Sequence, residues 1–348
     1  MSKFARFINT DEKFLIDSQP LFELKEGEVL VKNLCTSICR SDLHTYQGKR
    51  IEKSPTILGH EIVGIIEAFN PNAVLKDFKN IPLQVGDKIT WAIYASSPED
   101  ELSKANMPQK AKDLFKYGHE QITDVSHFHG GLSEHTILKK NTIIIKLTED
   151  LPNEIASLIN CSVATVAGAV RLAGAIQNKS VSIYGTGMLG IIACAMVSKM
   201  GATKVIAVDE SAERLEMAKQ FGANEIYFPK DALQHKVDIV LEFSGANEAM
   251  QNSIRILKIG GVAIWIGAVF PQSDIPINAE YIIRNLLTIK GLHNYNNEDF
   301  LNAVNFIEMN YRFFDFDKLI KKGFSLDNVS EAFEYAIAYN PFRVSIHL

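Results

Sequence analysis

Cysteine is scarce in this sequence, with four residues among 348. A disulfide-stabilised scaffold needs a far denser set, so we expect these cysteines to be reduced thiols in a cytoplasmic protein. Residues 1–19 carry charges throughout and contain no uncharged apolar run after a basic start. The sequence therefore predicts no secretory signal.

An excess of positive charge is also missing. The chain has 36 Lys and Arg against 41 Asp and Glu, a formal net charge of −5. A dedicated nucleic-acid binder should show a basic excess or stripe, so we expect no nucleic-acid partner. The most apolar long stretch, residues 155–176, contains Asn160 and Arg171. Such a stretch favours a buried helix over a membrane span.

The length predicts about two domains, and the pattern along the chain changes accordingly. The first half is rich in expected strands separated by Gly, Pro and Asn, at residues 28–33, 61–68, 87–91 and 141–147. After about residue 178, short apolar strands alternate with helical segments. The expected strands there are residues 181–184, 204–208, 237–241, 262–266 and 287–290, and the expected helices are 188–200, 211–221 and 247–257. That alternation predicts a parallel sheet with helices on both faces.

The end of the chain returns to a different pattern, with expected helices at 298–308 and 330–338 and a strand at 343–347. We therefore expect a discontinuous first domain of residues 1–155 and 296–348. The α/β domain of residues 156–295 would be inserted into it.

A glycine-rich turn of the form GxGxxG occupies residues 185–190. It follows an apolar strand and opens a helix, which is the context that dinucleotide binding requires. The glycines allow a tight turn and let backbone N–H groups approach a pyrophosphate at the helix N-terminus. The candidate cofactor-binding residues in this turn are Gly185, Gly187, Met188, Leu189 and Gly190.

A carboxylate stands at the end of the next strand. Asp209 follows Gly190 by 19 residues, near the spacing at which an acidic side chain accepts both ribose hydroxyls of NAD. The same carboxylate would repel the 2′-phosphate of NADP, whereas Arg214 nearby could pair with one. The sequence therefore predicts NAD as the cofactor, and Arg214 is the one nearby residue that weakens the preference over NADP.

Three residues are candidate zinc ligands: Cys39, His60 and Cys161. Two thiolates and an imidazole suit a catalytic zinc ion, which needs three protein ligands and one open position. These residues are far apart in the sequence, and a lone Cys161 would more often be an inert core thiol. We expect the remaining Cys35 and Cys194 to be buried core thiols.

The residues around these candidates strengthen the assignment. Cys39-Arg40-Ser41-Asp42-Leu43-His44 and Gly59-His60-Glu61 resemble the Cys-x-Ser/Thr-Asp-x-His and Gly-His-Glu segments of zinc-dependent medium-chain alcohol dehydrogenases. The twenty residues between Cys39 and His60, the later Cys161 and the glycine-rich turn follow the order of that family. This resemblance covers nearly the whole chain. It implies an α/β fold, in which a Rossmann doubly wound parallel sheet accompanies a GroES-like β-rich catalytic domain.

The resemblance also implies roles for the site residues. Cys39, His60 and Cys161 match the catalytic zinc ligands, and Glu61 matches an acidic residue behind the metal that can approach it. Asp42 matches a carboxylate that fixes the tautomer of the zinc-bound imidazole.

Further roles concern proton transfer and the cofactor. Ser41 matches the hydroxyl beside the substrate oxygen, and His44 matches the outer end of a proton relay. Arg214 matches a basic position near the adenine ribose. The implied reaction is hydride transfer between an alcohol, aldehyde or ketone and NAD. The family also implies a homodimer or homotetramer, with residues 264–269 and 286–290 as candidate contacts.

One stretch departs from the family pattern. Many members bind a second, structural zinc through four closely spaced cysteines, but residues 95–120 contain no cysteine, and Ala111 stands where the last would be. We therefore expect one catalytic zinc and no structural zinc of the usual type. His119, His127 and His129 lie nearby, and we expect ordinary loop histidines. Packing of Leu114, Phe115 and Tyr117 is an alternative support for this lobe.

Other functions remain open at this point. One is a polyol or sugar dehydrogenase of the same superfamily, although many of those place Glu where this chain has Cys161. A faint similarity of residues 107–120 and 130–135 to a subgroup associated with phosphonate breakdown would imply an anionic substrate. A zinc-free quinone reductase would have no use for these ligands, and a non-catalytic NAD-binding protein would not need them either.

Overall fold

The computed structural model describes residues 1–70, 75–124 and 126–348. By the density of internal contacts, the chain divides into two compact units. Unit 1 is Met1–Cys161 with Asn296–Leu348, and unit 2 is Ser162–Tyr295. The division after Cys161 falls six residues beyond the expected boundary at 155, because the chain continues in helical conformation from Asn153.

Unit 1 is built on an eight-stranded sheet. Its main path runs β15-β16-β3-β4-β5-β6, while β7 pairs with β3 and β8 pairs with β5. The strands are β3 (Val29–Ser37), β4 (Glu61–Phe69), β5 (Lys88–Ala95), β6 (Phe115–Lys116), β7 (His135–Leu138), β8 (Thr142–Lys146), β15 (Ile320–Ser325) and β16 (Arg343–His347). The C-terminal strand β16 pairs with both β3 and β15, so the end of the chain closes the unit formed by its beginning.

A hairpin and a set of helices complete unit 1. The hairpin of β1 (Ser2–Phe7) and β2 (Phe14–Gln19) packs its aromatic side chains into a core shared with α11, where the rings of Phe14 and Phe333 lie 4.8 Å apart. The α-helices are α1 (Arg40–Tyr46), α2 (Glu101–Lys104), α3 (Asn153–Ser157), α10 (Asn297–Asn310) and α11 (Val329–Tyr339). The shorter turns are η1 (Pro108–Lys110), η2 (Ile159–Val163), η3 (Phe316–Leu319) and η4 (Leu326–Asn328).

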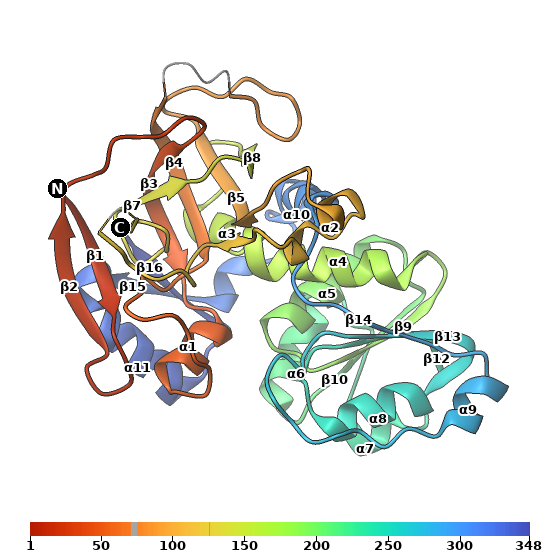
Figure 1. The fold of residues 1–348 in the computed structure, drawn as a ribbon. Coiled ribbons are helices and arrows are strands. Elements are labelled where there is room, and N and C mark those ends of the chain that lie inside the picture. Colours follow the sequence, from red (N-terminus) through yellow and green to blue (C-terminus); the bar gives the residue numbers. More distant parts are fainter. Residues whose placement is uncertain (71–74, 125) are drawn as a thin grey trace. The chain divides into compact units, whose positions relative to one another are not determined.

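Unit 2 is a doubly wound sheet of six parallel strands in the order β11-β10-β9-β12-β13-β14. These strands are β9 (Ser180–Tyr184), β10 (Lys204–Val208), β11 (Glu225–Tyr227), β12 (Val237–Glu242), β13 (Leu257–Trp265) and β14 (Thr288–Gly291). The helices are α4 (Ala164–Ala173), α5 (Met188–Lys199), α6 (Ala212–Gln220), α7 (Pro229–Ala232), α8 (Asn247–Arg255) and α9 (Ala279–Arg284). Figure 1 shows α4 and α5 on one face of this sheet and α8 on the other, which confirms the predicted parallel sheet covered on both faces.

The strand order also explains where unit 2 can bind a ligand. The chain leaves β9 towards β10 on one side and crosses to β12 on the other, so the order reverses at β9. Ligands of open α/β sheets bind beyond the carboxyl ends of the strands at such a reversal. The glycine-rich turn begins immediately after β9.

The apolar stretch that includes α3, η2 and α4 is long and apolar enough to cross a membrane. It covers Asn153–Ala173, and 83% of its most apolar window is buried inside the structure. A buried core helix passes the same test of length and composition. The burial agrees with the prediction of an interior helix, in which Ala164, Val166 and Ala169 are fully buried.

Candidate functional site

The first candidate ligand stands between a strand and a helix of unit 1. Strand β3 ends at Ser37, and Cys39 is the residue before the first turn of α1. The Asp42 carboxylate Oδ2 accepts a hydrogen bond from the Cys39 backbone N–H at 2.9 Å. A carboxylate in the first turn satisfies an N–H that the helix leaves unpaired, so the turn holds Cys39 in place.

The second candidate ligand lies directly before strand β4. His60 is almost fully buried, and its Nδ1 lies 3.4 Å from Asp42 Oδ1. On the other edge of the ring, Nε2 lies 3.4 Å from the Ser41 hydroxyl oxygen. Asp42 therefore contacts the backbone of Cys39 and the ring of His60 together. A carboxylate beside Nδ1 favours the tautomer that leaves Nε2 available to a metal ion.

The third candidate ligand lies in the π-helical turn η2. Asn160, the residue before Cys161, accepts a hydrogen bond from the backbone N–H of Ile62 at 3.2 Å and so ties this turn to β4. The ligand atoms of Cys39, His60 and Cys161 all lie within 4.8 Å of one another. Residues separated by up to 122 positions in the sequence thus converge on one point. Among the residues that the structure describes, these three form the group of potential metal ligands.

The protonation of this group suits a soft divalent cation. A hydrogen bond from Cys161 lowers the pKa of Cys39 well below the usual value for a thiol, and Arg343 lowers it further. The same bond raises the pKa of Cys161, so the pair shares a proton that a metal ion would displace. Two thiolates and one imidazole match a zinc ion with one coordination position left open. The residues therefore fit zinc.

Glu61 does not join the three ligands. Its carboxylate is fully buried and receives Arg343 Nε at 2.8 Å, Arg343 Nη2 at 3.0 Å and the Ser37 hydroxyl at 2.5 Å. Arg343 Nη2 also lies 3.7 Å from the Cys39 sulfur. In this structure Glu61 therefore anchors an arginine beside the thiolate.

Arg343 is a site residue that the sequence reasoning missed. It lies on β16 and is 282 positions from Glu61, so no spacing rule connects the two. An arginine at the start of a terminal strand in which Val344 and Ile346 alternate with polar residues was the signal that could have drawn attention to it.

The two residues expected to move protons both lie on α1. Ser41 contacts the ring of His60, as described above. His44 lies one turn further along the helix and is half-buried, and burial together with Arg40 lowers its pKa. A neutral imidazole at that position can accept a proton. The structure places Ser41 next to a candidate ligand, and His44 follows one turn later on α1.

In unit 2 the three glycines of the turn have different surroundings. Gly185 has a positive φ of 83°, and a Cβ there would lie 2.7 Å from the backbone nitrogen of Ser244. A Cβ on Gly190 would lie 2.0 Å from the carbonyl oxygen of Gly185. A Cβ on Gly187 would approach only Arg214 Nη1, at 3.7 Å. The first and third glycines are thus required by the fold, while the second leaves space for a ligand.

The helix that follows this turn offers unpaired donors. Gly187 is the N-cap of α5 and supplies no side-chain cap, so the N–H groups of Met188, Leu189 and Gly190 lie in the first turn, where a helix leaves them without internal partners. Such a helix start binds the pyrophosphate of a dinucleotide. The turn therefore fits the cofactor on the geometry of its own backbone.

Asp209 stands directly after β10, as the spacing predicts. Its carboxylate accepts hydrogen bonds from the backbone of Thr186 at 2.7 Å and from the backbone of Ser211 at 2.9 Å. These bonds connect the glycine-rich turn to the start of α6, where Ser211 caps the helix as expected. Asp209 and Arg214 thus both lie next to the glycine-rich turn.

The lobe of residues 95–120 is held by polar caps and aromatic packing. Asp100 accepts hydrogen bonds from Leu102 and Ser103 at the start of α2, and from Lys112. Tyr117 is fully buried, packs against Phe115 and accepts a hydrogen bond from the backbone of Lys139 at 2.7 Å. The expected packing of Phe115 and Tyr117 is confirmed.

The histidines near this lobe have separate surroundings. His127 packs against Phe22 and its Nδ1 lies 3.0 Å from the carbonyl oxygen of Thr123. Burial lowers the pKa of His129 to about 4. His119 stacks on His60, with ring centroids 5.1 Å apart. These three do not form a ligand group among the described residues.

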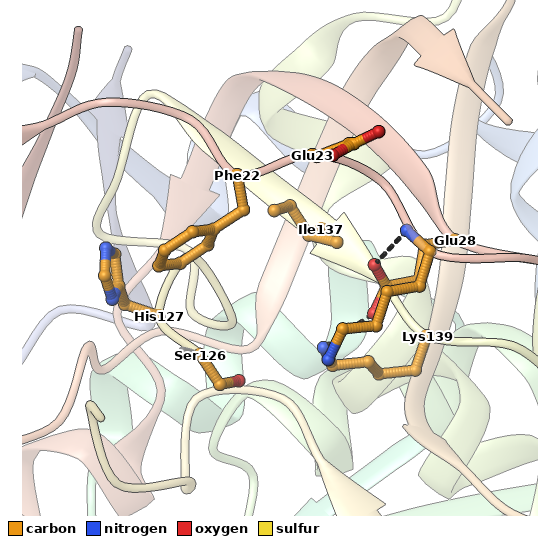
Figure 2. A pocket seen from close by; sticks show the side chains of 8 residues that line it. Phe22, Glu23, Glu28, Ser126, His127, Ile137 and Lys139 are labelled. Carbon is orange, nitrogen blue, oxygen red and sulfur yellow. Dashed lines mark hydrogen bonds and ion pairs between the residues drawn. The ribbon is translucent and has the colours of Figure 1, made fainter. Parts of the chain in front are cut away.

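Figure 2 shows a small hollow in unit 1 that is unrelated to the ligand group. Phe22, His127 and Ile137 line it together with the ion pair of Glu28 and Lys139, whose charged atoms lie 2.9 Å apart. Its volume of about 20 Å³ has room for a single water molecule. It is too small for a substrate.

Comparison with known proteins supports the assignment independently. The model of the alcohol dehydrogenase GroES-like domain matches residues 25–149, and the model of the zinc-binding dehydrogenase family matches residues 189–309. L-threonine 3-dehydrogenase of Thermococcus kodakarensis is 30% identical over 283 residues, which are 76% of this chain and 73% of that protein. Sorbitol dehydrogenase of Bacillus subtilis is 26% identical over 350 residues, covering 96% and 94% of the two chains.

A solved structure shows the same fold over the full length. Alcohol dehydrogenase from Thermotoga maritima superposes with a TM-score of 0.93 at 23% identity, covering 99% of each chain. The GroES-like and Rossmann architecture expected from the sequence is therefore confirmed. Taken with the sequence relatives and the geometry of the thiols and imidazole, these matches show that the chain belongs to the zinc-dependent medium-chain alcohol and polyol dehydrogenases.

Proposed function

We propose that this chain transfers hydride between an alcohol and NAD, with Cys39, His60 and Cys161 as the ligands of one catalytic zinc ion. The observation that carries the proposal is the convergence of these three ligand atoms within 4.8 Å. A zinc ion bound there would supply Lewis acidity that polarises a substrate oxygen and lowers its pKa.

The neighbouring residues have roles that follow from their contacts. Asp42 contacts Nδ1 of the His60 ring and the backbone N–H of Cys39 at the start of α1, so it holds two ligands in position. Arg343 balances the buried carboxylate of Glu61 and stabilises negative charge on Cys39. Glu61 remains a candidate to approach the metal if this ion pair opens.

Proton transfer is assigned to α1. The Ser41 hydroxyl lies beside His60 and would accept the substrate proton. His44, kept neutral by burial, is the next acceptor towards solvent. Removal of a proton through this helix would leave the substrate oxygen negatively charged, and that charge would help the carbon that bears it to release hydride to the cofactor.

The cofactor is assigned to unit 2. The N–H groups of Met188, Leu189 and Gly190 would bind the pyrophosphate, and the open space at Gly187 would let it approach. The Asp209 carboxylate would accept the adenosine ribose hydroxyls, which favours NAD over NADP. Arg214, with Nη1 beside Gly187, would add positive charge at the same turn.

A polyol or sugar substrate is the second candidate. It is favoured by the similarity to a sorbitol dehydrogenase over nearly the full length of both chains. A non-catalytic NAD-binding role is disfavoured, because such a protein has no need for two thiols and an imidazole in one buried group.

We assign the protein to the cytoplasm, with no nucleic-acid or membrane partner. The four cysteines are free thiols in the structure, and a zinc site of this type requires reduced sulfur. A homodimer or homotetramer is proposed through residues 264–269 and 286–290 of unit 2. Val269 and Leu286 are 57% and 71% exposed, and β14 is an edge strand, which is the kind of apolar edge that a second copy covers.

The test is a panel of alcohols and aldehydes, including sorbitol, assayed with NAD and NADP before and after chelation. We expect NAD-dependent turnover that chelation removes and added Zn²⁺ restores. Turnover that survives complete metal removal would contradict the zinc assignment, and faster reaction with NADP would contradict the role of Asp209.

A further inference from the structure

The lobe of residues 95–120 ends on a segment whose backbone is fixed by the rest of unit 1. The backbone N–H of Tyr117 donates to the Ile93 carbonyl oxygen at 2.9 Å. The backbone N–H of Gly118 donates to the His129 carbonyl oxygen at 2.8 Å. The last residues of the lobe therefore follow a defined path.

Gly118 brings this segment against a candidate zinc ligand. Its φ is 76°, and a Cβ there would lie 2.6 Å from the Gly59 carbonyl oxygen and 3.2 Å from the His60 Cβ. A side chain would collide with the backbone at Gly59, so glycine lets the two segments touch. The contact sets how closely the lobe approaches His60.

The next residue, His119, extends the contact to the ring of the ligand. The two imidazole rings stack with centroids 5.1 Å apart and planes inclined by 29°. Both residues are buried, with His119 8% and His60 2% exposed. The edges of the His60 ring already contact Asp42 and Ser41, and the stack adds a contact on its face. In a closely packed interior, the His60 ring cannot tilt towards that face unless His119 moves.

A buried carboxylate holds His119 in turn. Glu52 Oε1 lies 2.9 Å from His119 Nδ1, and a carboxylate can only accept, so the ring N–H donates to it. Arg50 Nε donates to the same oxygen at 2.6 Å. The Glu52 side chain is 9% exposed, so little water competes for this oxygen. The ring that lies against His60 is therefore fixed in its own plane.

We propose that His119 is a positioning residue of the metal centre, which holds the His60 ring in the orientation that it needs as a zinc ligand. Glu52 acts through His119, and Arg50 acts through Glu52. A ligand that is ordered before the ion arrives raises the metal affinity, because binding no longer has to order the ring. This inference rests on the proposed zinc site. It assigns a function to the lobe, which supports the ligand group through a ring contact.

Zinc affinity tests the proposal without any need for turnover. The Kd for zinc is measured by competition with a chromogenic chelator. His119→Ala removes the stack and should raise this Kd by about 10-fold or more, which is the scale on which partners of metal ligands act. His119→Phe keeps an aromatic ring against His60 and should stay within about threefold of the wild type. An unchanged Kd in His119→Ala, or an equal loss in both variants, would overturn the proposal.

His127→Ala is the matched control. His127 is another buried histidine of unit 1, 5% exposed, whose ring centroid lies 4.2 Å from that of Phe22. It lies outside the ligand group, so the Kd for zinc should stay within about twofold of the wild type. A similar loss of zinc affinity in both alanine variants would indicate a general loosening of unit 1 and would contradict a positioning role.

Glu52→Ala decides whether the carboxylate acts through the histidine. It should raise the Kd for zinc by about 3- to 10-fold in the wild-type background. In the His119→Phe background it should change the Kd by less than about twofold, since Phe has no ring N–H to donate. An equal factor in both backgrounds would show that Glu52 acts by its charge alone and would refute this part of the proposal. Both rings remain in Glu52→Ala, so it tests the proposal even if His119→Ala does not fold.

The visible spectrum of the cobalt-loaded chain reports the geometry of the ligands. We expect His119→Ala to change the position and intensity of the d–d bands, and His119→Phe and His127→Ala to match the wild type. Identical spectra in all four proteins would contradict the proposal. If zinc is bound but no alcohol or aldehyde is turned over, the proposed function fails, and the zinc affinities still decide this inference. A wild type that binds no zinc would overturn both.

Discussion

The two units of this chain assemble their candidate sites in opposite ways. In unit 2 the cofactor residues lie within one short part of the sequence, from Gly185 to Arg214, at the ends of neighbouring parallel strands. In unit 1 the ligand group combines Cys39, His60 and Cys161 with Arg343 from the last strand. A local site depends on backbone conformation, whereas a dispersed site depends on the sheet that brings distant segments together.

The two sites also use different chemical groups. The glycine-rich turn acts through backbone donors and through space left at Gly187. The ligand group acts through buried charged side chains whose partners are buried as well, such as Glu61 with Arg343. Mutations should therefore impair the two sites independently, and for different physical reasons.

The largest effect is expected from removing a ligand in unit 1. His60→Ala or Cys161→Ala should lower kcat by about 1,000-fold or more, because the Lewis acid is lost with the metal. NADH affinity should stay within about twofold, since the turn in unit 2 is untouched. Metal analysis, steady-state kinetics and NADH fluorescence measure the three quantities.

Cys35→Ala is the control for that experiment. Cys35 is a fully buried thiol on β3 and lies outside the ligand group. It should keep one zinc per chain. Normal metal content in His60→Ala, or metal loss in Cys35→Ala, would show that the dispersed site has been assigned to the wrong residues.

The next largest effect concerns the buried ion pair. Arg343→Met removes the guanidinium that pairs with the fully buried Glu61 carboxylate, which should destabilise unit 1 by about 3–5 kcal/mol. Denaturant unfolding measures the loss. The double variant Glu61→Gln with Arg343→Met should recover at least half of it, and Arg312→Met, which breaks an exposed pair with Asp150, should cost less than about 1 kcal/mol. No recovery in the double variant would contradict the charge argument.

A pair of glycine substitutions sharpens the comparison within unit 2. Gly187→Ala should fold normally, because its Cβ would approach only Arg214 within the protein. The same Cβ would occupy space that the cofactor needs, so the Kd for NADH should rise by about 10-fold or more. Gly190→Ala should instead lower the melting temperature, since its Cβ would lie 2.0 Å from Gly185 O; the cost is about 1–3 kcal/mol. Calorimetry and thermal unfolding distinguish the two. The same loss of stability in both variants would remove the distinction between a ligand position and a packing position.

The smallest effect is a pH dependence in unit 2. Burial raises the pKa of Asp238, but hydrogen bonds from Ser180 and the ion pair with Lys258 outweigh it and lower the pKa from 3.8 to about 2. A carboxylate with a depressed pKa stabilises the folded state above the unfolded pKa, and this contribution disappears as the pH falls from about 4 towards 2.

Asp238→Asn should therefore cost about 1–2 kcal/mol at pH 6 and progressively less as the pH approaches 2. Unfolding at several pH values measures it, with Asp274→Asn at an exposed position as the control. A cost that grows on acidification would give the opposite sign and contradict the assignment.

The sequence was a better guide to unit 2 than to unit 1, for a physical reason. Strand and helix periodicity predicted β9, β10, β12 and β13 with the helices between them, because each element buries its own apolar residues. The glycine turn and Asp209 could be read from spacing alone. In unit 1 the hairpin β1–β2 and the pairing of β16 with β3 were missed, since neither has a local signal that sets its partner.

The same limit applies to the candidate site. Cys39 and His60 were singled out because their neighbours form recognisable segments, and Cys161 because it follows them in the order of the family. Arg343 has no such context, and its place beside the site comes from long-range contacts with Glu61 and Cys39. Glu61 was expected behind the metal and able to approach it, and the sequence could not show that its carboxylate pairs with an arginine 282 positions away.

X-ray absorption at the zinc edge of the purified, zinc-loaded chain tests the central claim most directly. The account predicts a first shell with two sulfur atoms at about 2.3 Å and one imidazole nitrogen at about 2.0–2.1 Å, completed by one light atom. Cys161→Ala should lose one sulfur from that shell. A wild-type shell of nitrogen and oxygen alone, or one with four sulfur atoms, would contradict the account.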